Sequence, residues 1–251
     1  MPTQPRRLLL LLGSGPGIGA SIASLFTKNH PFNAIALIAR TASQLERDHE
    51  TVLAAAATAG RQDIDVRTWQ VDIGDLDLLQ RTLGEIEAFG QLECVYFNAA
   101  RVGPSPLLEF GVCGIEEDFR VSNLALYVTA RWAMPLLVKH QEESQSFAEY
   151  KPAFLVTNSL LPAVPIPDWF ALSMTKAAQA NLVKSLQQQF APQGVHIGLV
   201  VVWGIVSGDS PGLNPGNIAE QAWKLYAQEK GEWTGQVTIY DDGKVEWADT
   251  I

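Results

Sequence analysis

The sequence has few cysteines and no long apolar run near its N-terminus. Its 251 residues include only Cys94 and Cys113, which are too few for a disulfide framework and form no Cys-x-x-Cys pair. Such sparse cysteine is typical of a reducing compartment, so we expect a cytoplasmic protein. The apolar run Leu8 to Leu12 ends at Gly13, and it is too short for a membrane span or a secretory leader. We therefore expect no membrane-spanning segment.

Positive charge and metal-binding clusters are also scarce. The chain has 18 Lys and Arg against 27 Asp and Glu, a net charge of −9. Without dense basic clusters, nucleic acids and anionic membrane surfaces are disfavoured as partners. The four histidines are scattered without ligand spacing, so we expect no metal. Ser159 has no histidine base by motif, which disfavours a hydrolase, and Glu116-Glu117-Asp118 is interpreted as a solvated face.

Apolar runs of strand length alternate with longer segments of helical period, which predicts a single α/β domain over residues 1–251. We expect a doubly wound parallel sheet of about seven strands with helices on both faces. The expected strands are Arg7 to Leu12, Ala34 to Ala39, Asp65 to Gln70, Leu92 to Asn98, Ala153 to Asn158, Val195 to Val202 and Gln236 to Tyr240. The expected helices are Gly17 to Asn29, Ala42 to Thr58, Leu76 to Phe89, Ile115 to Lys139, Phe170 to Phe190 and Ile218 to Glu229.

A glycine-rich turn follows the first expected strand and opens a helix. Glycines allow positive φ and let backbone N–H groups approach a diphosphate, which then lies at the positive end of the helix. The strand-first context makes this turn more specific than an isolated glycine motif. The candidate cofactor-binding residues of the turn are Gly13, Ser14, Gly15, Gly17, Ile18 and Gly19.

The ends of the next two strands indicate which dinucleotide is bound. A carboxylate after the second strand would hold the ribose hydroxyls of NAD, whereas this sequence has Arg40 and Thr41 there. We therefore expect NADP(H), with the alternative that Arg40 is an ordinary solvated residue. After the third strand, Asp72 beside Ile73 is expected to accept from the adenine amino group, or else to cap the next helix.

Further residues recur in the order of one enzyme family. Asn98, Ala99 and Ala100 follow the fourth strand, Asn123 lies on the long helix, and Ser159 and Lys176 follow. With the glycine turn, they make the chain resemble the short-chain dehydrogenase/reductase family over nearly its whole length. The resemblance implies an oxidoreductase with Asn123, Ser159 and Lys176 in its active site. It also implies cofactor contacts from Asn98, Ala99, Ala100, Lys176, Gly204 and Val206.

One position departs from the family pattern. The family places its proton-donating tyrosine four residues before the lysine, so that both side chains share one helix face. Leu172 occupies that position here, at the family's usual spacing from Ser159. A leucine cannot protonate a developing alkoxide, so ordinary carbonyl reduction is expected to be severely impaired. Tyr127, one helical turn from Asn123, is a weaker substitute phenol.

The segment Pro165 to Trp169 is similar to one in a fungal subgroup, the reductase/Diels–Alderases of bridged indole alkaloid pathways. That resemblance implies an active-site Asp168 that pairs with a cationic substrate, a Trp169 that packs on it, and an active-site Arg131. In this chain Ile166 occupies the subgroup's aspartate position and the carboxylate comes two residues later. The alternatives are a helix N-cap for Asp168, core or interface packing for Trp169, and a surface or subunit contact for Arg131.

These observations predict an atypical NADPH-dependent reductase of an organic, secondary-metabolite-like substrate, such as an imine or iminium ion. The alternatives are a cyclase or pericyclase on the same scaffold and a non-catalytic NADP-binding protein. Family members commonly pair through two long helices, here Ile115 to Lys139 and Phe170 to Phe190, so a homodimer or homotetramer is expected.

Overall fold

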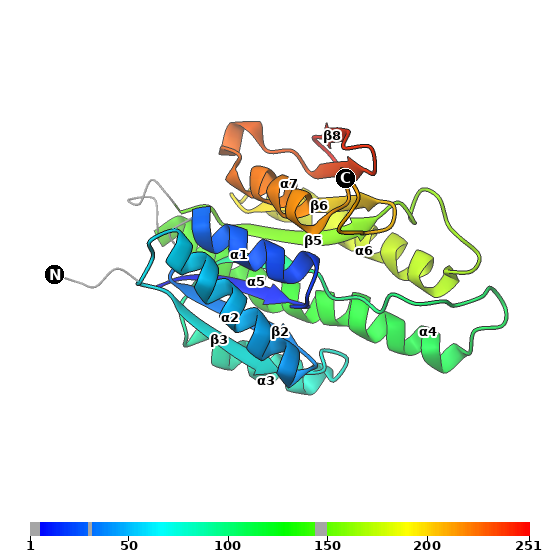
Figure 1. The fold of residues 1–251 in the computed structure, drawn as a ribbon, viewed down its shortest axis with the longest axis horizontal. Helices are drawn as coiled ribbons and strands as arrows, with labels where there is room; N and C mark the ends of the chain where they lie inside the picture. Colours follow the sequence, from blue (N-terminus) through cyan, green and yellow to red (C-terminus); the bar gives the residue numbers. More distant parts are fainter. Residues whose placement is uncertain (1–5, 30–31, 144–149) are drawn as a thin grey trace.

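Strands and helices alternate along the chain in this computed structural model, which describes residues 6–29, 32–143 and 150–251 (Figure 1). The strands are β1 Arg7–Leu12, β2 Ala34–Ala39, β3 Asp65–Gln70, β4 Gln91–Phe97, β5 Ala153–Ser159, β6 His196–Trp203, β7 Gln236–Tyr240 and β8 Val245–Ala248. The helices are α1 Ile18–Asn29, α2 Ala42–Thr58, α3 Leu76–Glu87, α4 Val112–Phe119, α5 Ala125–Glu143, α6 Phe170–Phe190 and α7 Pro215–Ala227, with a π-helical segment η1 Arg120–Leu124 and a short 3-10 helix η3 Lys230–Glu232.

All these strands form one sheet in the order β3-β2-β1-β4-β5-β6-β7-β8. Strands β1 to β7 all run parallel, and β8 is antiparallel to β7. The predicted doubly wound α/β fold is confirmed. The prediction missed β8, which returns from β7 through a tight turn with Gly243 at a φ of +88°. Three of its four residues are exposed, so it carries no apolar run that could have predicted it.

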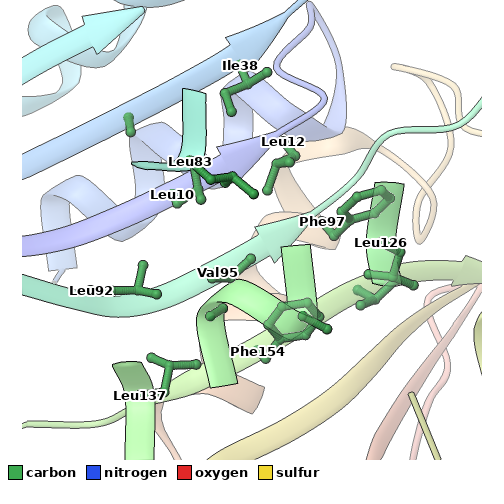
Figure 2. Close-up of a cluster of buried hydrophobic side chains, with 14 of the residues drawn as sticks. Leu10, Leu12, Ile38, Leu83, Leu92, Val95, Phe97, Leu126, Leu137 and Phe154 are labelled. Carbon is green, nitrogen blue, oxygen red and sulfur yellow. The ribbon is translucent and has the colours of Figure 1, made fainter. Parts of the chain in front are cut away.

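The uninterrupted leucines of β1 reflect burial on both faces of the sheet. Leu8, Leu10 and Leu12 point into one core and Leu9 and Leu11 into the other, and all five are fully buried. Figure 2 shows the first core, where Leu10 and Leu12 meet Val95 and Phe97 of β4, Phe154 of β5, and Leu126 and Leu137 of α5. A central parallel strand has no solvated face, which explains why its sequence does not alternate.

The helices divide between the two faces of the sheet. Helices α3, α5 and α6 contribute apolar residues to the core of Figure 2, whereas α1, α2 and α7 contribute to the opposite core. In Figure 1, α4 and the start of α6 extend beyond the ends of the strands. These extensions and the loops beside them enclose the site described below.

The expected helix from Ile115 to Lys139 is longer, and it contains the π-helical segment η1 at Arg120–Leu124. By length and composition alone, the continuous helix Val112–Glu143 could cross a membrane, so the expectation of no membrane-spanning segment stays a prediction. Leu126, Ala130 and Ala133 of this helix are buried against the sheet, however. Its apolar face therefore belongs to the core.

Candidate functional site

A cavity of about 1070 Å³ opens at the carboxyl ends of the parallel strands. Residues that follow β1, β2, β4, β5 and β6 line it. The chain continues from β1 toward β2 and β3 on one side and from β4 toward β5 and β6 on the other, so the strand order reverses between β1 and β4. Loops from the two sides diverge at such a reversal, and parallel α/β sheets bind their ligands there.

The glycine-rich turn forms one wall of this cavity. Gly13 has a φ of +87°, and a Cβ there would lie 2.6 Å from the backbone nitrogen of Ala99. A Cβ on Gly19 would lie 2.7 Å from the carbonyl oxygen of Gly13, whereas one on Gly15 or Gly17 would meet no protein atom within 4 Å. The back of the turn is therefore closed by backbone contacts, and its front leaves open space at the start of α1. This arrangement fits a dinucleotide diphosphate.

The remaining predicted residues of the turn, Ser14 and Ile18, also line the cavity. Asp48, which belongs to none of the predicted motifs, holds Ser14 in place. The Asp48 carboxylate of α2, which is 2% exposed, accepts from Ser14 Oγ and from Gln44 Nε2, each at 2.6 Å. Ser14 and Asp48 are 34 residues apart, so only the packing of α2 beside the turn brings them together.

Arg40 and Thr41 line the cavity at the end of β2, and both are exposed. No described residue forms a hydrogen bond or an ion pair with the Arg40 guanidinium. Asp72 does not line the cavity, although its neighbours Val71 and Ile73 do. Its carboxylate accepts from the backbone nitrogen of Gly74 at 2.9 Å. Asp72 is not the cap of α3, because the residue that caps this helix is Asp75, which accepts from Leu78 N. The contact of Asp72 with the adenine amino group stays a prediction.

A chain of hydrogen bonds connects the glycine turn to Lys176 on α6. Asn98 Nδ2 donates to the Gly13 carbonyl at 3.1 Å, and Thr157 Oγ1 donates to Asn98 Oδ1 at 2.8 Å. Lys176 Nζ donates to the Thr157 carbonyl at 2.8 Å and to Gln179 Oε1 at 3.0 Å. Burial lowers the pKa of Lys176 to about 8. Asn98, Thr157 and Lys176 all line the cavity, as do Ala99 and Ala100.

Asn123 lies in the π-helical segment η1 and does not line the cavity. Its Nδ2 donates to the Thr175 carbonyl at 3.0 Å, and its buried Oδ1 has no partner among the described residues. Gln179 Nε2 donates to the Ser122 carbonyl at 2.8 Å, so a side chain beside Lys176 also holds this segment. A π-helical turn often marks a functional site, and here it lies directly against the helix that carries Lys176.

Ser159 and Leu172 line the cavity together with Lys176. The Ser159 Oγ accepts from the backbone nitrogen of Leu161 at 3.3 Å, and Leu172 is 6% exposed. Among the described residues that line the cavity there is no tyrosine, histidine or cysteine. Tyr127 is 54% exposed on α5 and lies outside the lining. The structure therefore does not support it as a substitute phenol.

The structure separates the three residues implied by the fungal resemblance. Trp169 lines the cavity at the start of α6, but Asp168 and Arg131 are exposed and lie outside the lining. The Asp168 carbonyl accepts from Ser105 N at 2.8 Å, and this backbone pairing fixes the loop. The N-cap of α6 is Trp169, without a side-chain hydrogen bond, so Asp168 is not its cap. Ile166 instead lines the cavity.

Gly204 and Val206 line the cavity after β6. A Cβ on Gly204 would lie 2.7 Å from Leu213 Cδ1, and the φ of Gly204 is +157°. This glycine therefore allows the chain to turn closely past Leu213 as it leaves the sheet.

A buried ion pair in the cavity wall corrects the interpretation of Glu116-Glu117-Asp118 as a solvated face. Glu116 and Glu117 are exposed, but Asp118 is 2% exposed and holds Arg101 with two hydrogen bonds. Arg101 Nε donates to Asp118 Oδ1 at 2.5 Å and Nη2 to Oδ2 at 2.9 Å. Arg101, Glu117 and Asp118 all line the cavity. No local pattern predicts the pair, because its partners belong to a loop and a helix.

Comparisons with known proteins agree with this architecture. The family model described as short chain dehydrogenase matches residues 7–210. A glucose 1-dehydrogenase of Gluconobacter oxydans is 26% identical over 258 residues, covering 94% of this chain and 90% of that protein. A metagenomic short-chain oxidoreductase in complex with NADP has a TM-score of 0.76 at 19% identity, covering 93% of this chain and 96% of that chain.

A second solved structure, the NADH-dependent reductase A1-R′ complexed with NAD, has a TM-score of 0.74 at 17% identity and covers 94% of each chain. The structural likenesses show the same fold with either nicotinamide dinucleotide bound. The family match extends from β1 to beyond β6 and therefore includes the glycine turn, Ser159 and Lys176. The chain belongs to the short-chain dehydrogenase/reductase family of nicotinamide-dependent oxidoreductases.

Proposed function

We propose that this protein is an NADPH-dependent reductase of an organic substrate whose acceptor carbon needs no proton from a tyrosine. The observation that carries the proposal is the cavity wall at α6. Leu172 lines the cavity four residues before Lys176, and the described lining contains no phenol, imidazole or thiol. An imine or iminium ion is the acceptor that best suits such a site.

The argument rests on charge at the reacting centre. A bound nicotinamide cofactor supplies the hydride. A ketone becomes an alkoxide and requires a proton in the transition state, whereas an iminium ion becomes a neutral amine and requires only a counter-charge. The lining contains two carboxylates, and Asp118 is paired with Arg101. We therefore assign the counter-charge to Glu117, which is exposed and has no ion pair among the described residues. Asp168 lies outside the lining and is not assigned this role.

Arg40 supports NADPH rather than NADH as the reductant. Its guanidinium, which has no partner among the residues that the structure describes, lines the cavity at the end of β2, and the sequence has no acidic residue at this position. A guanidinium binds a phosphate through charge-assisted hydrogen bonds, which the ribose hydroxyls of NADH cannot match. One solved structure with this fold holds NADP and another holds NAD, so the fold alone does not decide between the two dinucleotides.

A cyclase or pericyclase on the same scaffold is the second candidate. It is favoured by the apolar character of the wall beside Ser159, because a cyclisation needs an enclosed apolar surface more than an acid. The apolar residues of this wall are Leu160, Leu161, Ile166, Trp169, Leu172 and Val206. In that reaction the cofactor would be retained as a structural or electrostatic element.

The test is NADPH consumption against a matched panel of cyclic imines and the corresponding cyclic ketones. We expect oxidation of one NADPH per imine reduced and little turnover of ketones. Rapid reduction of the ketones would contradict the proposal. Consumption of a substrate without NADPH oxidation would favour the cyclase, and tight NADPH binding without any turnover would favour a nucleotide-binding protein. Glu117→Gln should slow imine reduction, with Glu116→Gln as the exposed neighbouring control that lies outside the lining.

We also propose that the protein acts as a homodimer or homotetramer in the cytoplasm. Ala177 is exposed and Ala178 and Ala180 are half-buried on α6, which leaves room for a second copy to pack closely. Both cysteines are free thiols, in line with a reducing compartment. Sedimentation at micromolar concentration should give a mass of two or four chains, and a monomer would contradict the proposal.

A further inference from the structure

Two side chains, Asp118 and Phe110, hold Arg101 in the wall of the cavity. Asp118 binds it through two hydrogen bonds and raises the pKa of its guanidinium. The Arg101 Cζ lies 4.8 Å from the centre of the Phe110 ring. Gly103 leaves space for the guanidinium, because a Cβ there would lie 2.9 Å from Arg101 Nη1. An arginine that is fixed in one position binds a ligand without losing side-chain entropy on binding.

The Arg101 guanidinium has N–H donors that Asp118 does not use. It carries five N–H groups, and Asp118 accepts from two of them. The other three N–H groups, including both on Nη1, have no hydrogen-bond acceptor among the described residues. Because Arg101 lines the cavity, and its side chain is 31% exposed, these donors are available to a molecule bound there.

The location of Arg101 suits a substrate contact. Two residues before it, Ala99 packs on Gly13 of the cofactor turn. Four residues after it, Ser105 pairs with the backbone at Asp168 and Trp169. Arg101 therefore lies on a segment that contacts the cofactor turn at one end and the loop before α6 at the other.

Local charge determines which ligand group fits these donors. The Arg101–Asp118 pair is neutral overall, and Glu117 beside it adds one negative charge at the cavity wall. An anionic group would be repelled by Glu117 and would compete with Asp118, whereas a neutral oxygen accepts hydrogen bonds without that penalty. A carbonyl or amide oxygen is a neutral acceptor with two lone pairs.

We propose that Arg101, fixed by Asp118 and Phe110, binds a neutral carbonyl or amide oxygen of the substrate and so sets specificity. This inference rests on the proposed reductase function and adds to it the class of substrate: an apolar imine that carries an amide or carbonyl group away from the reacting carbon. The apolar wall of Ile166, Trp169 and Leu172 receives the body of this molecule, and Arg101 holds its oxygen.

The test compares two cyclic imines that differ at one group, a carboxamide in the first and an isopropyl group of similar shape in the second. In Arg101→Met, we expect KM for the carboxamide to rise about tenfold, KM for the isopropyl compound to change less than twofold, and kcat to stay nearly constant for both. Arg101→Lys should recover part of the loss. An equal rise in KM for both compounds would assign Arg101 a structural role, and a tenfold weaker NADPH affinity would assign it to the cofactor.

Two additional measurements keep the outcome unambiguous. Arg101→Met leaves the Asp118 charge buried without its partner, so the double variant Arg101→Met/Asp118→Leu is included to remove both charges. If the unaltered protein reduces neither imine, the proposed reaction fails. Calorimetric titration of the NADPH-loaded protein with the same two compounds then tests Arg101 separately. Tighter binding of the carboxamide that is lost in both variants would support the inference, and equal binding of the two compounds would overturn it.

Discussion

The two halves of the cavity differ in whether backbone or side-chain atoms form most of the wall. The cofactor half is centred on the backbone of one continuous segment, Gly13 to Gly19, whose shape is fixed by contacts such as Gly13 against Ala99. The substrate half, around Leu172, is formed by side chains from separate segments: the loop after β4, helix α4, and the loop before α6. The first half fits a ligand shared by the whole family, and the second half can change its substrate by changing side chains alone.

The largest effect is expected from filling the back of the glycine turn. Gly13→Ala places a Cβ 2.6 Å from the Ala99 nitrogen in a backbone with positive φ, so unfolding should become easier by about 3 kcal/mol or more. Chemical denaturation measures this change, and NADPH binding should fall with it. Gly15→Ala, whose Cβ meets no protein atom, is the control and should unfold as the unaltered protein does. Equal stability of the two variants would show that the backbone around Gly13 accommodates a Cβ without strain.

The buried ammonium of Lys176 should make stability depend on pH. Below pH 8 the lysine is protonated in both states, and the folded protein bears the full cost of burying its charge. Between pH 8 and its ordinary pKa of 10.5, the folded state binds fewer protons than the unfolded state, so the free energy of unfolding should rise. The rise relative to Lys176→Met should reach about 3 kcal/mol.

Chemical denaturation from pH 7 to 10.5 measures this difference between the two proteins. The comparison removes the contribution of the other titrating groups, because both proteins share them. A difference that stays constant over the whole range would show that Lys176 keeps its proton in the folded state.

A phenol at position 172 should change the substrate half without disturbing the cofactor half. Leu172 lines the cavity beside Lys176, so Leu172→Tyr offers a proton donor to a bound ketone. We expect ketone reduction to increase about tenfold or more, which is less than the usual contribution of a general acid, about a hundredfold or more. Leu172→Phe supplies the same ring without the hydroxyl group and should give no increase. NADPH oxidation with a cyclic ketone measures the rate, and equal rates in the two variants would assign the change to ring packing.

The smallest effect is expected at the edge of the cofactor half. Arg40→Ala should weaken NADPH binding by roughly tenfold and leave NADH binding nearly unchanged, because only NADPH carries the additional phosphate. Calorimetric titration with both nucleotides checks this. Arg81→Ala removes the same charge from an exposed position of α3 outside the cavity and serves as the control. A protein that binds both nucleotides equally before substitution would contradict the assignment of NADPH.

The sequence alone was sufficient for the features that depend on neighbouring residues. Strand-length apolar runs such as Leu8 to Leu12 predicted a sheet buried on both faces, because a central parallel strand leaves no side solvated. The spacing of Gly13, Gly17 and Gly19 predicted the turn, since the backbone conformation of a glycine is a local property. The short exposed strand β8 and the π-helical segment η1 were missed, because neither has a periodic apolar signal.

Only the tertiary structure decided how side chains meet across the chain. Asp48 accepts a hydrogen bond from Ser14, Asp118 binds Arg101, and Asp168 lies outside the cavity lining. The sequence suggested a solvated face for Asp118, and an active-site role or a helix cap for Asp168. In each case the outcome depends on how a helix or loop packs against a segment distant in sequence. Burial and ion pairing are properties of that packing, so the sequence determined the fold and the cofactor turn, whereas the substrate half was decided in three dimensions.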